Sequence, residues 1–486
     1  MSVLQNAAET AARSQREPLT HWIGGRGVVS PETTYRVGVD PATGGPGVGV
    51  PAGTAQDVDL AVRSADAAAW NWRKTASAER GRVLAAIAAT LRARAEELAD
   101  LEISDTGKPR RTALAEVIGA ADYFEFYAGL VNLPHGEVID VVPGQHVYTL
   151  REPFGVIGVI TPWNLPINQA ARAVAPALAA ANTVVAKPAE VTSRTTLELA
   201  RIATKQGLPD GVFNVVLGSG TVVGEALVRH PLVRKLAFTG SVGVGQSIGR
   251  LAADRVLPLT LELGGKSANV VFDDADLEFA ATEAVRAFTT NAGQVCSAGT
   301  RLLVQSTIHD AFVDAVVSAT RRLKVGTHLG PLITEGQFRT VQEYFHIARV
   351  EGATAATGGQ VATGSGMGFY VEPTVYTGVT NDMRIAREEI FGPVLVVVPF
   401  ETEDEAVALA NDSDFGLVAG VWTQNVSRAL RVAECLEVGQ VFVNTWSTAS
   451  VQTSFGGQKL SGYGREKGIE ALNHYSQVKS VSIALR

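Results

Sequence analysis

The feature that most constrains this chain is a regular alternation of apolar strands and helices that begins near residue 154. Five apolar runs are separated by helical segments and read FGVIGVIT, NTVVAK, VFNVVLG, RKLAFTG and LPLTLEL. Runs that are apolar throughout are typical of strands buried on both faces, and strands joined by helices pair in parallel. The pattern predicts an α/β fold whose parallel sheet is covered by helices on both faces.

A second set of apolar runs follows residue 263 and reads ANVVF, RLLVQ, LVVVPF, LVAGVWT and GQVFVN. A chain of 486 residues exceeds what one core usually organises, so we expect a second α/β unit here. The first 130 residues read as helices, one of them running from an N-cap at Ser77 to Glu102. The segment EVIDVVPGQHVYTL, around Pro143 and Gly144, predicts a hairpin that serves as an edge or assembly arm.

Charge and cysteine usage exclude several classes of protein. A net charge of −7 and 19% charged residues give no basic surface for nucleic acid or membrane. Two cysteines form no disulfide framework, and the N-terminus lacks the apolar core of a secretory signal. The most apolar run, AVAPALAAANTVVA, is too short to span a bilayer and is interrupted by Pro176 and Asn182. We therefore expect a cytoplasmic protein with no nucleic-acid or membrane partner.

Polar residues follow the predicted strands at their carboxyl ends, where open α/β sheets bind ligands. Asn164 follows the first strand, Lys187 and Glu190 follow the second, and Gly240 and Ser241 open the helix after the fourth. Glycine and a helix N-terminus suit a pyrophosphate, and a lysine with a carboxylate suits ribose hydroxyls. Each signal is weak alone: Lys187 and Glu190 also fit an exposed ion pair, and GSGTVVG is one residue longer than GxGxxG.

Glu262 alternates with leucines in LPLTLELGG, so it lies on the opposite face of its predicted strand. That face is either exposed or interior. The apolar flanks and the two terminal glycines favour the interior, where a carboxylate must be paired or functional.

Cys296 lies in NAGQVCSAGTR, a loop of small residues that leaves its sulfur approachable. An isolated cysteine is more often a buried packing residue, and we expect that role for Cys435 in the helix ALRVAECLEV. A nucleophilic cysteine in a hydrolase takes a histidine base, and none of the eight histidines lies in a suitable motif. The candidate carboxylate and the candidate nucleotide site favour redox chemistry. Two alternatives are a cysteine-dependent esterase or glutaminase-like hydrolase, and a non-catalytic binding protein.

Seven motifs occur together in a characteristic order: ITPWNLP, KPAE, FTGSVGVG, LELGGKSANVVF, GQVCSAGTR, EEIFGPV and SFGGQKLSGYGRE. With them, the chain from about Trp22 to its C-terminus resembles the NAD(P)-dependent aldehyde dehydrogenase superfamily. Glu262 places the resemblance in the hydrolytic, non-acylating branch, which forms carboxylic acids, rather than the branch that transfers the acyl group to coenzyme A.

The resemblance implies an α/β fold with a Rossmann-like cofactor domain, an α/β catalytic domain and a small β oligomerisation element. The implied NAD-binding domain takes residues 1–130 and 151–262, and the catalytic domain takes 263–465. The oligomerisation element takes 131–150 and 466–486, and it implies a homo-oligomer, either a dimer or a tetramer. No metal site is expected.

The same resemblance implies the roles of individual residues. Cys296 would be the nucleophile, Asn164 with the backbone N–H of Cys296 the oxyanion hole, and Glu262 the general base. Lys187 and Glu190 would hold the adenosine ribose, Gly240 and Ser241 would approach the pyrophosphate, and Glu389 and Phe391 would position the nicotinamide. The remaining cofactor residues would be Ile160, Pro162, Trp163, Gly220, Gly224 and Phe238. The carboxylate of Glu190 favours NAD, because it would repel the 2′-phosphate of NADP, although NADP remains possible.

The implied substrate is a small-molecule aldehyde in a tunnel lined by Leu165, Gln169, Arg172, Val295, Ser297, Trp446, Ala449 and Phe455. Gln169 and Arg172 are polar where relatives carry apolar side chains, which predicts a polar or anionic substrate. Alternatively, Arg172 pairs with an acid at a subunit contact, because a buried arginine needs a partner. Small Thr448 and Ala449 imply a wide mouth. Ala173 stands where relatives often have a lysine, which removes a relay from Glu466 to Glu262 or shifts it onto Arg172.

Overall fold

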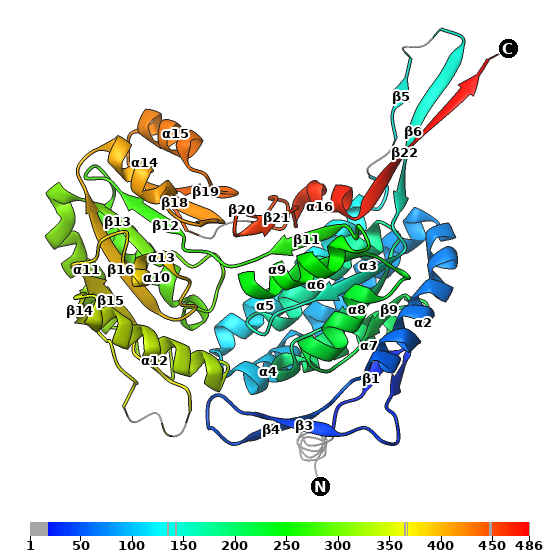
Figure 1. Ribbon diagram of the computed structural model, residues 1–486, viewed down its shortest axis with the longest axis horizontal. Helices are drawn as coiled ribbons and strands as arrows, with labels where there is room; N and C mark the ends of the chain where they lie inside the picture. Colours follow the sequence, from blue (N-terminus) through cyan, green and yellow to red (C-terminus); the bar gives the residue numbers. More distant parts are fainter. Residues whose placement is uncertain are drawn as a thin grey trace.

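The computed structural model describes residues 18–133, 136–140, 143–363, 366, 368–446 and 450–485. Two lobes, each built on one large sheet, lie side by side, and a narrow arm projects from one of them (Figure 1). The expectation of two α/β units is confirmed. Among the helices of the described residues, none combines the length and the apolar character that a bilayer crossing requires.

The sheet of the first lobe has eight strands, of which the five central ones are parallel. They correspond to the five predicted runs. Successive residues such as Val184 and Val185 point to opposite faces of the sheet and both are buried, which is why these runs are apolar throughout. In spatial order the strands are β2 (Arg26–Val28), β1 (His21–Ile23), β9 (Phe213–Val215), β8 (Thr183–Lys187), β7 (Val156–Ile160), β10 (Val233–Thr239), β11 (Leu259–Glu262) and β21 (Gly462–Tyr463).

Helices cover both faces of this sheet. One face packs against α2 (Ala55–Lys74), α8 (Glu225–Arg229) and α9 (Val242–Ala253). The other packs against α6 (Pro166–Ala179) and α7 (Arg194–Lys205), with α3 (Ser77–Ala93), α4 (Ala95–Thr106) and α5 (Arg110–Leu130) outside them. Nearly every residue of α6 is buried, as expected of an alanine-rich helix enclosed between a sheet and further helices.

One local expectation in this lobe is wrong. The helix expected from an N-cap at Ser77 to Glu102 is two helices separated at Arg94, and its N-cap is Ala76. The hydroxyl of Ser77 donates instead to Asn132 on the neighbouring segment at 2.6 Å. The strand β21, within the 263–465 range expected for the catalytic unit, pairs antiparallel with β11 of the first sheet.

The second lobe has a seven-stranded sheet that is parallel except at one edge. Its strands are, in spatial order, β14 (Thr354–Thr357), β15 (Thr374–Thr377), β16 (Val394–Phe400), β13 (Arg301–Gln305), β12 (Ala268–Val271), β18 (Val418–Trp422) and β19 (Gln440–Val443). One face packs on α10 (Leu277–Thr289) and α11 (His309–Arg321). The other packs on α12 (Glu335–Val350), α13 (Arg384–Arg387), α14 (Glu403–Asn411) and α15 (Val426–Cys435).

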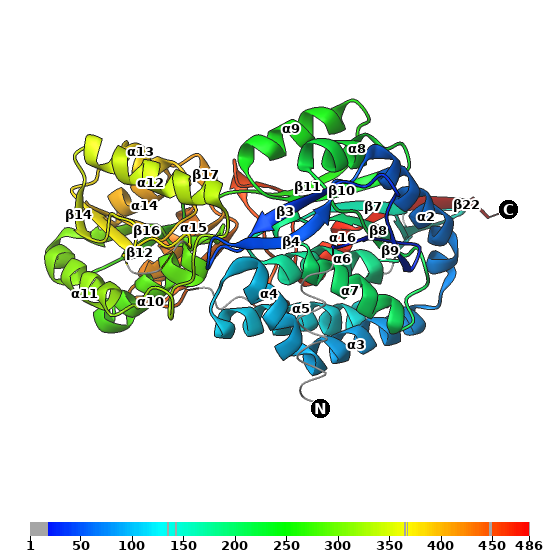
Figure 2. The ribbon, with the colours of Figure 1, turned by 90° about the horizontal axis from the view of Figure 1, so that it is seen from below.

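The predicted hairpin is present and forms part of the projecting arm (Figure 1). Strand β5 (Val138–Ile139) pairs with β6 (Gln145–Pro153), and β6 also pairs with the C-terminal strand β22 (Ser476–Ala484). Before β22, α16 (Gly468–His474) packs on α6. A separate ribbon of β3 (Tyr35–Val39) and β4 (Pro46–Pro51) faces the viewer in Figure 2, and a short pair joins β17 (Phe415–Gly416) to β20 (Gln458–Lys459).

Candidate active site

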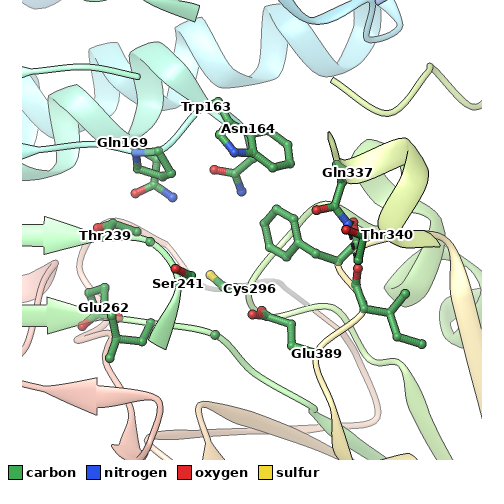
Figure 3. Close-up of a pocket in the computed structure, with 16 residues that line it drawn as sticks. Trp163, Asn164, Gln169, Thr239, Ser241, Glu262, Cys296, Gln337, Thr340 and Glu389 are labelled. Carbon is green, nitrogen blue, oxygen red and sulfur yellow. Dashed lines mark hydrogen bonds between the residues drawn. The ribbon is translucent and has the colours of Figure 1, made fainter. Parts of the chain in front are cut away.

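The two lobes meet at a cavity of about 280 Å³ beside the carboxyl ends of β10 and β11. Figure 3 shows Cys296 in its centre, with Asn164, Glu262 and Glu389 around it. The predicted residues that line the cavity are Pro162, Trp163, Asn164, Gln169, Gly240, Ser241, Glu262, Cys296, Glu389 and Phe391. Segments far apart in the sequence therefore converge on one thiol.

The loop before Cys296 has a strained backbone. Asn291, Ala292 and Gly293 have φ of +52°, +55° and +73°. A positive φ raises the conformational energy of Asn291 and Ala292, whereas glycine adopts it without strain. Such strain persists only where surrounding contacts fix the conformation. In the described part of the chain the backbone N–H of Cys296 donates to no protein acceptor, and the residue is half-buried. The loop thus presents a thiol and a free N–H to the cavity together.

Two glycines after β11 allow the lobes to approach this closely. A Cβ on Gly265 would lie 2.5 Å from the carbonyl oxygen of Cys296, and one on Gly264 would lie 2.2 Å from a carboxylate oxygen of Glu389. Both distances are far shorter than any real contact, so larger residues would displace the Cys296 loop or Glu389.

Asn164 is buried and is held through both its side chain and its backbone. Its amide Nδ2 donates to the carbonyl of Gln294 at 2.8 Å, which ties it to the Cys296 loop. Its own carbonyl accepts from Nζ of Lys108 at 2.9 Å and from Nδ2 of Asn291 at 3.0 Å. One N–H of the Asn164 amide is therefore used for positioning, and the second is left for a ligand.

Lys108 belongs to a buried ionic cluster that the sequence did not reveal. Its Nζ donates to Glu116 at 2.5 Å and lies 3.8 Å from Glu102. Glu102 in turn accepts from the backbone N–H of Ile167, in the first turn of α6, at 2.9 Å. Burial raises the pKa of Glu116 to about 8, and the positive charge of Lys108 limits this rise. The cluster fixes the start of α6, and with it Asn164.

Glu262 is interior, as its flanking sequence favours, with 2% of its surface exposed. Neither of its carboxylate oxygens has a hydrogen-bond partner among the described residues. Burial, with the nearby charge of Glu466, raises the pKa of Glu262 well above its usual value, and the charges of Arg172, Arg465 and Lys467 oppose this rise. A carboxyl group that is buried, unpaired and in a cavity is poised to exchange protons rather than to stabilise the fold.

The Cys296 thiol is also shifted away from its ionised form. Burial raises its pKa to about 11, and the charges of Arg172 and Lys467 oppose that rise. The thiol is therefore protonated at neutral pH. Reaction at sulfur requires an acceptor for its proton, and no histidine lines the described cavity.

Aromatic and acidic side chains line another part of the cavity. The rings of Trp163 and Phe391 meet edge to face at 5.4 Å, and Phe391 has a strained φ of +56°. Gln337 on α12 holds that loop by donating to the carbonyls of Ile390 at 2.7 Å and Phe391 at 3.0 Å. Glu389 accepts from the N–H of Gly265 at 3.1 Å, and burial raises its pKa to about 7.

The helix α9 begins at the edge of this cavity with Ser241 as its N-cap. No side chain caps its first turn, whose residues include exposed Gly243 and Val244, so its backbone N–H groups are open to an anion. Lys187 is buried at the end of β8, and burial lowers its pKa. One carboxylate oxygen of Glu190 is buried without a hydrogen-bond partner, although Arg36 lies 3.7 Å away.

Several predicted cofactor residues lie outside the cavity itself. Ile160 and Phe238 pack in one apolar cluster with Val223, which lies in the π-helical turn Gly220–Gly224. Ser219 caps this turn by accepting from the N–H of Val222. Lys187 and Glu190 also do not line the cavity, and Glu190 borders a separate one with Arg194 and Asp105.

Of the predicted tunnel residues, only Gln169 lines the cavity in the described part of the chain. Trp446 and Phe455 share an apolar cluster against which Cys296 packs. Leu165, Val295 and Ser297 are half-buried beside Asn164 and Cys296. Ala449, with Thr448, lies outside the described residues.

Arg172 is not left open to a substrate in this structure. It is buried, its Nε forms an ion pair with Glu466, and its guanidinium lies over the ring of Phe455 at 5.2 Å. Of the two readings of Arg172, the geometry favours pairing with an acid, but the acid belongs to the same chain rather than to a subunit contact. Cys435, expected in the core, is exposed at the end of α15.

The sequence missed six residues that line the cavity. Thr239, Leu263 and Gly264 flank predicted residues, and their place at the same strand ends was the available signal. Ile390 likewise lies between Glu389 and Phe391. Gln337 and Thr340 lie on α12 with no motif around them, and nothing in the sequence indicates that this helix reaches the cavity.

Known proteins resemble this chain over nearly its whole length. The aldehyde dehydrogenase family profile matches residues 29–481. An indole-3-acetaldehyde dehydrogenase in complex with NAD+ is 38% identical, with a TM-score of 0.96 over 98% of this chain and 99% of that one. Betaine aldehyde dehydrogenase from Staphylococcus aureus, also in complex with NAD+, is 37% identical, with a TM-score of 0.95 over 98% and 96%. The aldehyde dehydrogenase KauB from Pseudomonas aeruginosa is 37% identical, with a TM-score of 0.96 over 98% and 99%.

The fold is that of an oxidoreductase that acts on aldehydes. The chain belongs to the aldehyde dehydrogenase family.

Replacing Lys108 with Met should destabilise the fold, because it leaves the buried Glu116 and Glu102 without their cation. Breaking a buried ion pair from one side costs about 3–5 kcal/mol. Chemical denaturation checks this, with Lys205→Met on the exposed surface of α7 as the matched control. The double variant Lys108→Met, Glu116→Gln should recover part of the loss. Equal midpoints for Lys108→Met and Lys205→Met would contradict the role of the cluster.

Proposed function

We propose that this enzyme oxidises an aldehyde to a carboxylic acid with NAD, through a thiohemiacetal and then a thioester on Cys296. The observation that carries the proposal is the convergence of Cys296, Asn164 and Glu262 on one cavity. The same cavity is also lined by Trp163, Glu389 and the start of α9.

The first chemical step is the addition of Cys296 to the aldehyde carbon. Glu262 accepts the thiol proton, because both its oxygens are unpaired, whereas Glu389 is held by the N–H of Gly265. The alkoxide that forms lies between the free N–H of Cys296 and the second N–H of the Asn164 amide. One such donor is typically worth about 3 kcal/mol of transition-state stabilisation.

The second step hydrolyses the thioester. Glu262 deprotonates the attacking water, a general-base contribution usually worth about 10²–10⁴-fold. A base buried beside the thioester supports its hydrolysis by water rather than transfer of the acyl group to coenzyme A. Gly456 keeps room for it, since a Cβ there would lie 2.8 Å from Glu262 Oε1.

The residues present fit a dinucleotide cofactor. The uncapped N-terminus of α9, with Gly240 and Ser241, would hold the pyrophosphate, and Lys187 with Glu190 would hold a ribose. Glu389 and Phe391 would position the nicotinamide ring and its ribose beside Cys296. When bound, NAD would supply the oxidising power by accepting the hydride of the former aldehyde carbon, and this loss converts the thiohemiacetal on Cys296 into the thioester. Similar solved structures of an indole-3-acetaldehyde dehydrogenase and a betaine aldehyde dehydrogenase are NAD+ complexes, and the Glu190 carboxylate favours NAD over NADP.

The division of the chain follows the same proposal. The cofactor domain comprises the first sheet with its helices, the catalytic domain comprises the second sheet, and the arm of β5, β6 and β22 assembles a homodimer or homotetramer. A cytoplasmic location stays a prediction.

Two other functions fit the cavity less well. A cysteine-dependent hydrolase would need a base for its thiol other than a histidine, because none lines the described cavity. A non-catalytic protein would not need an unpaired carboxylate buried beside an approachable thiol, since such a carboxylate costs stability.

The proposal is tested by following nicotinamide absorbance with NAD and a panel of aliphatic, aromatic, cationic and acid-bearing aldehydes. Cys296→Ser should reduce the rate by at least about 10³-fold, because an alcohol is a far weaker nucleophile at neutral pH. Cys435→Ser, at the exposed cysteine, should retain the full rate. Equal rates for the two variants would overturn the assignment of Cys296.

Glu262→Gln separates the two steps. The first turnover of NADH should remain visible as a burst, while the steady-state rate falls by about 10²–10⁴-fold. Because the raised pKa keeps Glu262 protonated at low pH, the hydrolysis rate should increase with pH above the usual carboxyl range in the wild type. This increase should disappear in the variant. Rapid-mixing absorbance over a pH series measures both effects, and an undiminished steady-state rate would exclude Glu262 as the base.

A further inference from the structure

Lys467 has a backbone conformation that few residues other than glycine adopt. Its φ is +60° and its ψ is 173°. This region typically costs a non-glycine residue about 1–3 kcal/mol. The neighbours on both sides hold it there. Glu466 exchanges two backbone hydrogen bonds of 2.7 Å with Phe455, and the N–H of Gly468 donates to Val451 at 2.8 Å.

The Lys467 side chain lies against the apolar cluster on which Cys296 packs, behind the residues that line the cavity. Its Nζ lies 4.9 Å from the centre of the Phe455 ring, which also carries the Arg172 guanidinium at 5.2 Å. Phe455 belongs to the apolar cluster against which Cys296 packs. The lysine charge is near enough to act on the Cys296 thiol and on Glu262.

The two cations on this ring differ in how their charge is compensated. Arg172 has an ion pair with Glu466, whereas no carboxylate of the described residues lies within ion-pair distance of Lys467. Burial lowers the pKa of Lys467 to about 8, so it is mostly charged at neutral pH. Glu262, the remaining nearby acid, acts on Lys467 through its charge and forms no ion pair with it among the described residues. A half-buried ammonium without an anion is costly, and a bound anion would relieve that cost.

We propose that Lys467 is a specificity-determining residue that binds the carboxylate of an aldehyde substrate bearing an acid group at its far end. This inference rests on the proposed function, because it names the substrate class of the same site. It also transfers the predicted preference for an anionic substrate from Arg172, whose charge is already paired, to Lys467.

A reaction at Cys296 that needs no aldehyde and no cofactor tests the charge directly. Iodoacetate and iodoacetamide both transfer a two-carbon group to the thiol with loss of iodide, but only iodoacetate is anionic. Both reagents react with the same thiolate, so the ratio of their rates at one pH does not depend on how much of the thiol is ionised. Each variant is made in a Cys435→Ser background, so that Cys296 is the only thiol. Lys467→Met should lower the iodoacetate-to-iodoacetamide ratio by about tenfold. Lys467→Gly should do the same, since glycine accepts this backbone without strain.

Lys459→Met is the matched control, because Lys459 also has a positive φ, of +52°, but pairs with Glu437 away from the cavity. It should leave the ratio unchanged. A ratio that is equal in the wild type and in both Lys467 variants would overturn the proposal.

Kinetics with a matched pair of aldehydes then test the substrate class. The wild type should have at least about tenfold higher kcat/KM for 4-oxobutanoate than for butanal, and Lys467→Met should abolish this preference while butanal turnover persists. Equal loss for both aldehydes, or no preference in the wild type, would overturn the proposal. If the wild type oxidised no aldehyde, the proposed function would fail, and the alkylation ratio would still decide the role of Lys467.

Discussion

The close contact between the end of β11 and the loop that carries Cys296 determines the rest of the site. Gly264 and Gly265 connect the first sheet to the second, and neither can carry a side chain without displacing Glu389 or Cys296. The same short connection therefore joins the lobes, places Glu262 at the end of its strand, and brings the thiol to the edge where the first sheet can bind a ligand. Close packing at this point makes the active site a property of both lobes.

Buried charge explains how the site keeps its geometry while remaining reactive. The cluster of Lys108, Glu102 and Glu116 is paired and holds the backbone of Asn164 and the first turn of α6. Glu262 is equally buried, but its carboxylate has no hydrogen-bond partner in the part of the chain that the structure describes. Burial raises the pKa of both Glu116 and Glu262, but Glu116 is held by Lys108, whereas the oxygens of Glu262 are left to exchange protons with a ligand. The contrast between these groups separates positioning residues from reacting ones.

The sequence predicted the parts of the fold and site that depend on local pattern. Apolar runs predicted the central strands, and strand ends predicted Asn164, Gly240 and Glu262, because in a parallel sheet these ends share one edge. Gln337 and Lys108 were missed because their roles come from tertiary contacts, which no local pattern encodes. Cys435 was misplaced for a related reason: apolar neighbours on a helix did not determine which side of α15 faces the core.

Arg172 and Lys467 illustrate why a charged residue does not by itself identify a substrate. Helical spacing placed Arg172 beside the tunnel. Its charge is compensated by an ion pair with Glu466, which lies far from it in the sequence. The residue next to that partner is held in a strained conformation and has no counter-ion among the described residues. Burial makes an uncompensated charge expensive, so the fold must gain something by retaining one. In an oxidoreductase that acts on small molecules, we therefore expect the uncompensated cation near the nucleophile, rather than the paired one, to select the substrate.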